Sequence, residues 1–62
     1  MELVNKLFAL AQDLAKSQGF YGRLLRTLQE MTNDDLQDLE NTMEQELGLH
    51  ADNLDIILWL ES

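Results

Sequence analysis

The sequence contains no cysteine and no proline, and only three of its 62 residues are glycine. Without cysteine, neither a disulfide nor a Cys/His zinc site can form within the chain, although small scaffolds commonly rely on such staples or on a partner subunit. This absence also suits a reducing compartment. The length allows one domain, and we expect residues 1–62 to fold as a single unit with a thin core.

Long apolar runs are absent as well. The longest spans residues 56–60, far short of the roughly 20 residues that a membrane-spanning helix needs. The first residues lack the basic stretch of a secretory signal. We therefore expect a cytoplasmic protein with no membrane partner.

Positive charge is missing from half of the chain. Through Met31, four Lys and Arg residues face three Asp and Glu residues, whereas from Thr32 onward nine acidic residues stand without a single Lys or Arg. The formal net charge is −8. Direct binding to nucleic acid needs Lys and Arg to displace counterions, so we do not expect it. A basic protein surface is the partner that this charge favours.

Apolar residues recur at intervals of three and four, which predicts helices. We expect helices over residues 2–17 and 20–31, a third that starts at Thr32 and stops at Gly48, and a fourth over residues 53–61. The fourth is open to a second interpretation, because Leu54, Ile56, Leu58 and Leu60 also fit the period of a strand. A lone strand would leave its edges unpaired, so a helix is favoured. The fold class is all-α, a compact bundle of three to four short helices.

Two glycines are expected to end helices. Gly19 falls where a left-handed C-cap would lie after the first helix, and Gly48 followed by Leu49 resembles a Schellman stop with its hydrophobic contact. Gly22, near the start of the second helix, would allow a neighbouring helix to approach closely.

Two capping boxes are expected to begin helices. Thr32 with Asp35, and Asp52 with Asp55, have the spacing of a capping box. In such a box, the side chain of the cap residue accepts from an unpaired N–H of the first turn, and an acidic side chain of that turn accepts from the N–H of the cap residue.

No residue pattern supports catalysis or a metal site. His50 is the only histidine, and it is interpreted as a solvated loop residue. The acidic residues do not follow the ligand spacing of an EF-hand loop. We therefore expect no cofactor, no metal and no enzymatic activity.

The acidic residues of the third helix have two interpretations. They form a solvated face, or Asp34, Asp38, Glu40 and Glu44 imitate a phosphate backbone. In the second case the chain would be a DNA mimic that occupies the groove of a nucleic-acid-binding protein.

The stretch from Ser17 to Arg26 is the most distinctive in the chain, since two glycines bracket two aromatic residues. Tyr21, Arg23 and Arg26 either form a contact patch for a partner, or Phe20 and Tyr21 seal a corner while the arginines neutralise the acidic third helix. The run Ser17-Gln18-Gly19-Phe20-Tyr21-Gly22-Arg23-Leu24 resembles small helical proteins of bacteriophages, prophages and other mobile elements. That resemblance implies a bacterial cytoplasm and an accessory or regulatory role toward host machinery.

Trp59 is the remaining candidate contact, because the last helix is apolar nearly all round. Such a helix is central to a core or half buried in a partner, and a homodimer through it is one way to cover it. Taken together, the sequence predicts an acidic module that binds another protein.

Overall fold

The computed structural model describes residues 1–62 as four α-helices and no strands. They are α1 (Glu2–Leu14), α2 (Gly19–Glu30), α3 (Asn33–Leu47) and α4 (Asn53–Glu61). The all-α prediction is confirmed, and the segment that also fitted a strand is a helix. None of the helices is long and apolar enough to cross a membrane.

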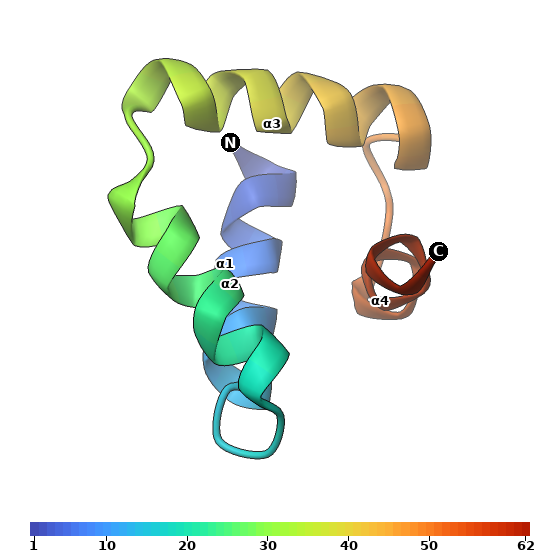
Figure 1. The fold of residues 1–62 in the computed structure, drawn as a ribbon. Helices are drawn as coiled ribbons and strands as arrows, with labels where there is room; N and C mark the ends of the chain where they lie inside the picture. The colour runs from blue at the N-terminus through green and yellow to red at the C-terminus, as the bar shows by residue number, and fades with distance from the viewer.

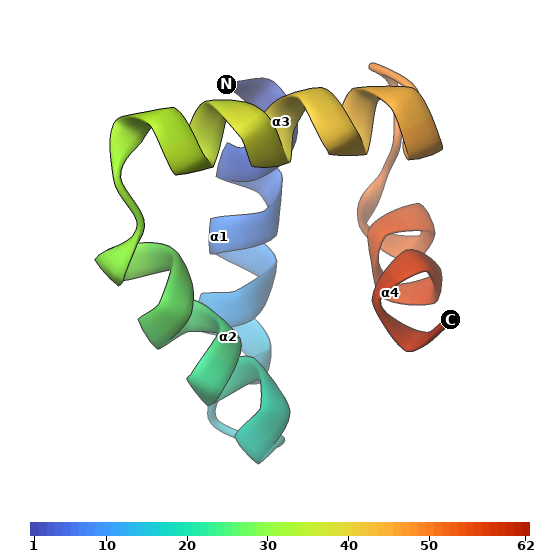
Figure 2. The same ribbon diagram turned by 45° about the horizontal axis from the view of Figure 1, so that its top comes forward.

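The helix α1 is the centre of the fold, and it contacts each of the other three helices. Figure 1 shows α3 lying across the end of α1 at which the chain starts, while α2 and α4 extend away from opposite ends of α3. The view in Figure 2 shows the same arrangement, with α4 apart from α2. One side of α4 therefore packs against other helices, and its opposite side does not.

The core follows the apolar stripe of α1. Leu3, Val4, Leu7, Leu10 and Ala11 are buried there, and the other helices add fewer buried residues each. Tyr21 and Leu28 come from α2, Met43 from α3 and Ile56 from α4, and Ala51 of the α3–α4 linker completes the apolar set. Leu36, Leu39 and Leu47 of α3 pack against this core together with Met43.

The first helix ends three residues earlier than predicted, and Gly19 is not its cap. The chain leaves α1 through a turn in which the Ser17 and Gln18 N–H groups both donate to the Leu14 carbonyl. Gln18 is then extended, at φ −139° and ψ 122°, and Gly19 opens α2. Gly48 alone has a positive φ, so the reversal at Gln18 uses backbone angles that any residue can adopt.

Gly48 ends α3 as expected, with φ 88° and its N–H donating to the Glu44 carbonyl. The hydrophobic contact of a Schellman stop was a wrong prediction, because Leu49 is 53% exposed. At ψ 160°, Gly48 sends the chain away from α3 toward α4 instead of folding it back. The expected close approach at Gly22 is also absent, since no atom lies within 4 Å of a Cβ built there.

Both N-caps are present, and one is complete. Asp52 and Asp55 form the reciprocal capping box, with each backbone N–H donating to the other residue's carboxylate at 3.3 and 2.9 Å. Thr32 forms only its own half, accepting from the Asp35 N–H at 3.2 Å. These local bonds fix where α3 and α4 begin.

Candidate interaction surface

Glu40 was predicted as one of four outward phosphate mimics, and this prediction is wrong. Its side chain is buried, at 4% exposure, and lies on the same side of α3 as Leu36 and Met43. One carboxylate oxygen accepts from the Val4 N–H at 2.9 Å and the other from the Leu3 N–H at 3.3 Å.

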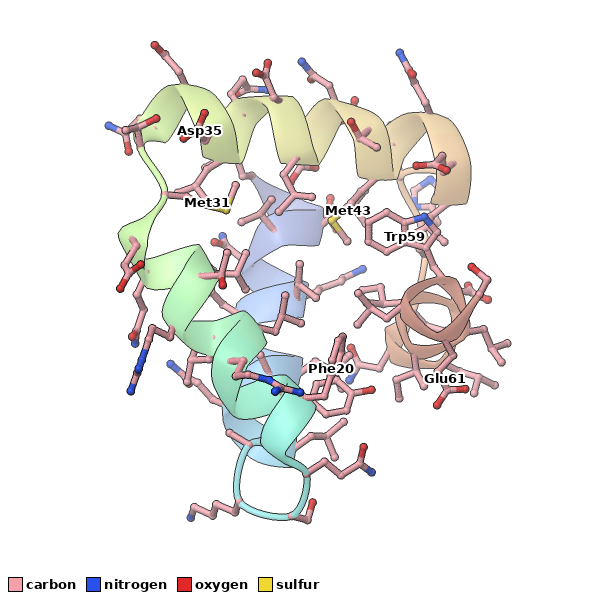
Figure 3. The ribbon with its side chains drawn as sticks, viewed as in Figure 1. Phe20, Met31, Asp35, Met43, Trp59 and Glu61 are labelled. Carbon is pink, nitrogen blue, oxygen red and sulfur yellow. The ribbon has the colours of Figure 1, made fainter.

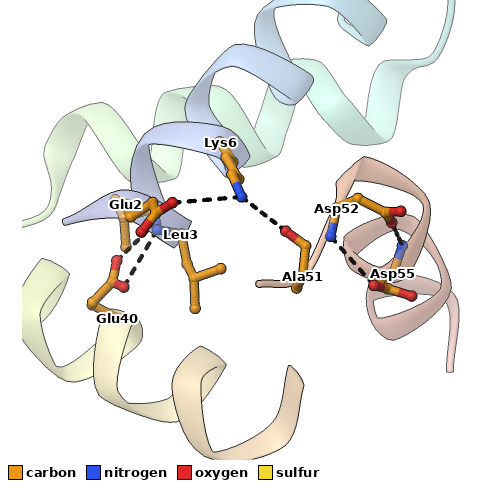
Figure 4. A network of polar contacts seen from close by, with 8 residues as sticks. Glu2, Leu3, Lys6, Glu40, Ala51, Asp52 and Asp55 are labelled. Atoms are coloured by element: carbon orange, nitrogen blue, oxygen red, sulfur yellow. Dashed lines mark hydrogen bonds and ion pairs between the residues drawn. The ribbon is translucent and has the colours of Figure 1, made fainter. Parts of the chain in front are cut away.

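The reason lies at the start of α1. The first four N–H groups of any helix have no partner within that helix, and Met1, the residue in the cap position, provides no side-chain bond. Glu40 supplies the missing acceptor from α3, and its negative charge lies at the positive end of the α1 dipole. Figure 4 shows these two bonds joining α1 and α3. Glu40 is therefore a tertiary N-cap and no part of a surface.

Lys6 joins α1 to the linker before α4. Its ammonium donates to the Ala51 carbonyl at 3.0 Å and lies 3.8 Å from the Glu2 carboxylate. The next residue after Ala51 is Asp52, the cap of α4, so the polar contacts in Figure 4 run from α1 through the linker into the last helix. This set of bonds determines where α4 begins relative to the core.

Tyr21 is not available as a contact residue. It is 4% exposed, and its ring packs edge-on against Phe20 with the centroids 5.3 Å apart. Phe20, by contrast, is 47% exposed, so the corner is sealed by Tyr21 alone. Arg23 and Arg26 are exposed, and neither forms an ion pair with α3, because the Glu2–Lys6 contact is the only ion pair in the molecule. The structure therefore removes Tyr21 from the expected Tyr21/Arg23/Arg26 patch and leaves the two arginines exposed.

The other three acidic candidates on α3 are exposed. Asp34, Asp38 and Glu44 all lie on its solvent side. By the 3.6-residue period, Asp34 and Asp38 share the outermost line while Glu44 lies on one flank. Because Glu40 points inward, the four predicted charges do not form a row. Asp34 and Asp38 form a pair, and Glu44 lies apart from them.

Trp59 faces the interior of the molecule. Figure 3 shows it on the side of α4 that faces α3, near Met43, and it is half-buried against the core. Ile57 and Leu60 are likewise half-buried there, around the fully buried Ile56. The candidate contact on α4 is therefore not its tryptophan.

The opposite side of α4 carries the exposed apolar residues that the residue-by-residue reasoning missed. Leu54 and Leu58 are 62% and 56% exposed, the two highest values among the large apolar residues. They lie one turn apart, so they form a single ridge. Asp55 and Glu61, both exposed, lie on opposite sides of this ridge. We call these four residues the α4 face. The signal was present in the sequence, because an all-round apolar helix on a small scaffold must leave one side uncovered.

An open hollow of about 440 Å³ adjoins this surface and is lined by Lys6, Asp52, Asn53 and Leu54. One of its lining residues is apolar, whereas small-molecule sites are lined mainly by apolar and aromatic side chains. The chemistry of the hollow therefore differs from that of a typical ligand site, and the α4 face is the stronger candidate. Comparisons with family models, with curated proteins and with solved structures find no match to this chain.

Proposed function

We propose that this chain is a small recognition module, which acts by binding another protein through the α4 face and not by catalysis. The observation that carries the proposal is the exposure of Leu54 and Leu58, at 62% and 56%, beside carboxylates on both flanks. Single exposed leucines are ordinary on protein surfaces. Two that form one ridge, on a helix whose other apolar residues pack inward, provide a continuous apolar strip.

The size of an ordinary interface sets what else the partner touches. A stable interface buries roughly 800 Å² on each partner, which is about a fifth of this chain's 4275 Å² surface. Two leucines supply only the centre of such a footprint. Asp55 and Glu61 must fall within it, because they adjoin the ridge on either side.

Charge then selects the class of partner. No Lys or Arg occurs from Thr32 to Ser62, so no side chain of α3 or α4 forms an ion pair with Asp55 or Glu61, although Asp55 accepts one backbone bond from Asp52. A partner with an apolar patch rimmed by Lys or Arg complements this surface. A second copy of the chain complements it poorly, since pairing two α4 faces would bring acidic residues of the two copies together. The homodimer is thus the less favoured occupant.

The DNA-mimic alternative rests on Asp34, Asp38 and Glu44 alone, because Glu40 caps α1. That alternative would place the partner on α3, so the two proposals differ in which helix the partner contacts. The resemblance of the Ser17–Leu24 run to phage and mobile-element proteins supports a bacterial host protein as the partner in both cases, with the chain as an accessory or regulatory factor.

The experiment compares matched surface variants against a purified partner. A protein captured from a lysate of the source organism is identified, purified and titrated calorimetrically against three forms of the chain. These are the unmodified chain, the variant Leu54→Gln/Leu58→Gln, and the variant Asp38→Asn/Glu44→Gln, which removes two of the three exposed mimic charges from α3.

We expect the α4 variant to bind much more weakly. Burying a leucine fully is worth about 1.5–3 kcal/mol, and somewhat over half of each side chain is still exposed, so the pair contributes roughly 2–3 kcal/mol, or about 30–150-fold in affinity. The α3 variant should lose less than about fivefold, because exposed charges contribute little each. Unchanged affinity of the α4 variant would refute the proposal, and a large loss for the α3 variant alone would favour the DNA mimic.

A further inference from the structure

The α4 face offers side chains and no backbone. Its residues lie within a regular helix, Asn53–Glu61, whose N–H and C=O groups are engaged along the helix itself. There is no strand in the fold, so a partner cannot bind by adding a strand to a sheet edge, which is one common mode of peptide recognition. A partner must therefore contact the ridge of Leu54 and Leu58 with its own side chains.

A proline-rich segment does not fit this surface. Polyproline segments dock into grooves lined by aromatic side chains, whereas the single aromatic residue of α4, Trp59, lies on the side that faces α3. A helix fits it well. The ridge of one helix packs into the groove of another at an interaxial distance of 8–10 Å, and long Lys and Arg side chains reach from there to both flanks.

The charges beside the ridge determine which residues should flank the apolar side of the partner's helix. Asp55 lies on one side of the ridge, and Glu61 lies on the other, near the C-terminal end of α4, where the helix dipole is negative. α4 has no basic residue in its last turn. A cation from outside would therefore meet the unpaired Glu61 carboxylate and the last carbonyls at one end of the ridge, and at the other end the Asp55 carboxylate, which already accepts from the Asp52 N–H.

Resting on the proposed function above, we propose that the α4 face binds an amphipathic helix of the partner, which places apolar residues at i, i+3 and i+4 on Leu54 and Leu58 and Lys or Arg on both flanks. The occupant is thus a basic amphipathic helix of another protein. A second copy of this chain lacks that chemistry, because its own α4 carries the same carboxylates.

Three synthetic peptides test the proposal against the intact chain. The first is a leucine–lysine peptide with helical spacing, the second has the same composition in a scrambled order, and the third has glutamate in place of lysine. Binding is followed by amide chemical shifts in NMR, so that the contacted residues are identified. The variant Leu54→Gln/Leu58→Gln is titrated in parallel, with Asp38→Asn/Glu44→Gln as the control for unspecific charge attraction.

We expect the first peptide to shift amides mainly within residues 53–61 and to bind at least about tenfold more tightly than the scrambled and glutamate peptides. Its affinity should fall at least about tenfold for the Leu54/Leu58 variant and less than about threefold for the α3 variant. Equal binding of the scrambled peptide that still depends on Leu54 and Leu58 would overturn the helical occupant while leaving the proposed function intact. Binding that ignores Leu54 and Leu58 would overturn both.

Two further measurements exclude other occupants. A dimer in sedimentation that dissociates in the Leu54→Gln/Leu58→Gln variant would assign the face to a second copy. Recruitment to phosphatidylcholine vesicles that is lost in the same variant would assign it to a membrane surface. Either result would overturn the proposal, whereas a monomer that ignores the vesicles would support it.

Discussion

Replacing Glu40 by alanine tests the contact that joins α3 to the start of α1. The Glu40 carboxylate accepts from the Val4 N–H at 2.9 Å and the Leu3 N–H at 3.3 Å, and its side chain is 4% exposed. In the variant, both donors lose their acceptor in a region where Leu3 and Val4 are themselves 0% and 1% exposed. Water therefore has little access to replace the lost bonds.

The magnitude follows from these two bonds. A hydrogen bond to a charged group contributes about 1.5–3 kcal/mol, and a buried donor left unpaired costs about 1–3 kcal/mol. Removing the carboxylate also removes the cost of keeping it out of water, which offsets part of this loss. We expect a net loss of roughly 2–4 kcal/mol for Glu40→Ala. A chain of this length has a total stability of about 3–9 kcal/mol, so the variant should unfold far more readily.

The assay is urea and thermal unfolding followed by far-ultraviolet circular dichroism, with Glu44→Ala as the matched control. Glu44 lies one turn further along α3 and is exposed, and its replacement by alanine changes the intrinsic helix propensity by the same amount. Its replacement should change the stability by less than about 0.5 kcal/mol. At about 4–8 °C per kcal/mol for a small domain, Glu40→Ala should lower the Tm by roughly 10–30 °C.

Hydrogen exchange gives a second readout that is specific to this contact. In the Glu40→Ala variant, the Leu3 and Val4 amides should lose protection to a greater extent than amides in the middle of α2. Equal stability of the two alanine variants, or unchanged protection of Leu3 and Val4, would refute the assignment of Glu40 as the cap of α1.

Five other replacements test the remaining structural assignments. Lys6→Met should lower the stability by about 1 kcal/mol through the lost bond to the linker carbonyl, since the partly exposed ion pair adds little. Gly48→Ala should cost about 1–2 kcal/mol because φ is 88°, whereas Gly22→Ala should add about 0.5–1 kcal/mol inside a helix with open space around it. Tyr21→Ala should destabilise by about 3–4 kcal/mol and Arg23→Ala by less than 0.5, as expected for a buried and an exposed residue. Urea unfolding checks each value, and the opposite sign for either glycine would contradict the backbone argument.

Much of the fold could be predicted from local patterns. Apolar residues at intervals of three and four located every helix, and the spacing of Asp52 and Asp55 placed the start of α4 correctly. These signals act between neighbours in the chain, so one sequence is enough to detect them. The early end of α1 could not be predicted in the same way, because its apolar stripe continues to Ala15 while the turn to α2 begins there.

The misassigned residues depended on contacts between distant segments. Glu40 and Leu3 are 37 positions apart, so the bond between them could not be predicted from local patterns. One local clue was available, because Glu40 follows Leu36 by four residues and precedes Met43 by three, which places it on the apolar side of the helix. The missing local cap at Met1 was a second clue, since an uncapped helix start requires an acceptor from elsewhere. For Tyr21 the sequence left a contact patch and a sealed corner open, because the direction in which α2 faces α1 decides its burial.

Leu54 and Leu58 are exposed because the chain has too few other helices to cover both sides of α4. Only 11 of the 62 residues are buried, and five of them belong to α1, which contacts all the other helices. The helix α4 packs one side against α1 and α3 and places Ile56 there, so its second apolar side has no element left to cover it. Polar residues at positions 54 and 58 would leave every observed core contact in place. The leucines are therefore not required for folding, and the Leu54→Gln/Leu58→Gln variant should match the unmodified chain in stability within about 0.5 kcal/mol.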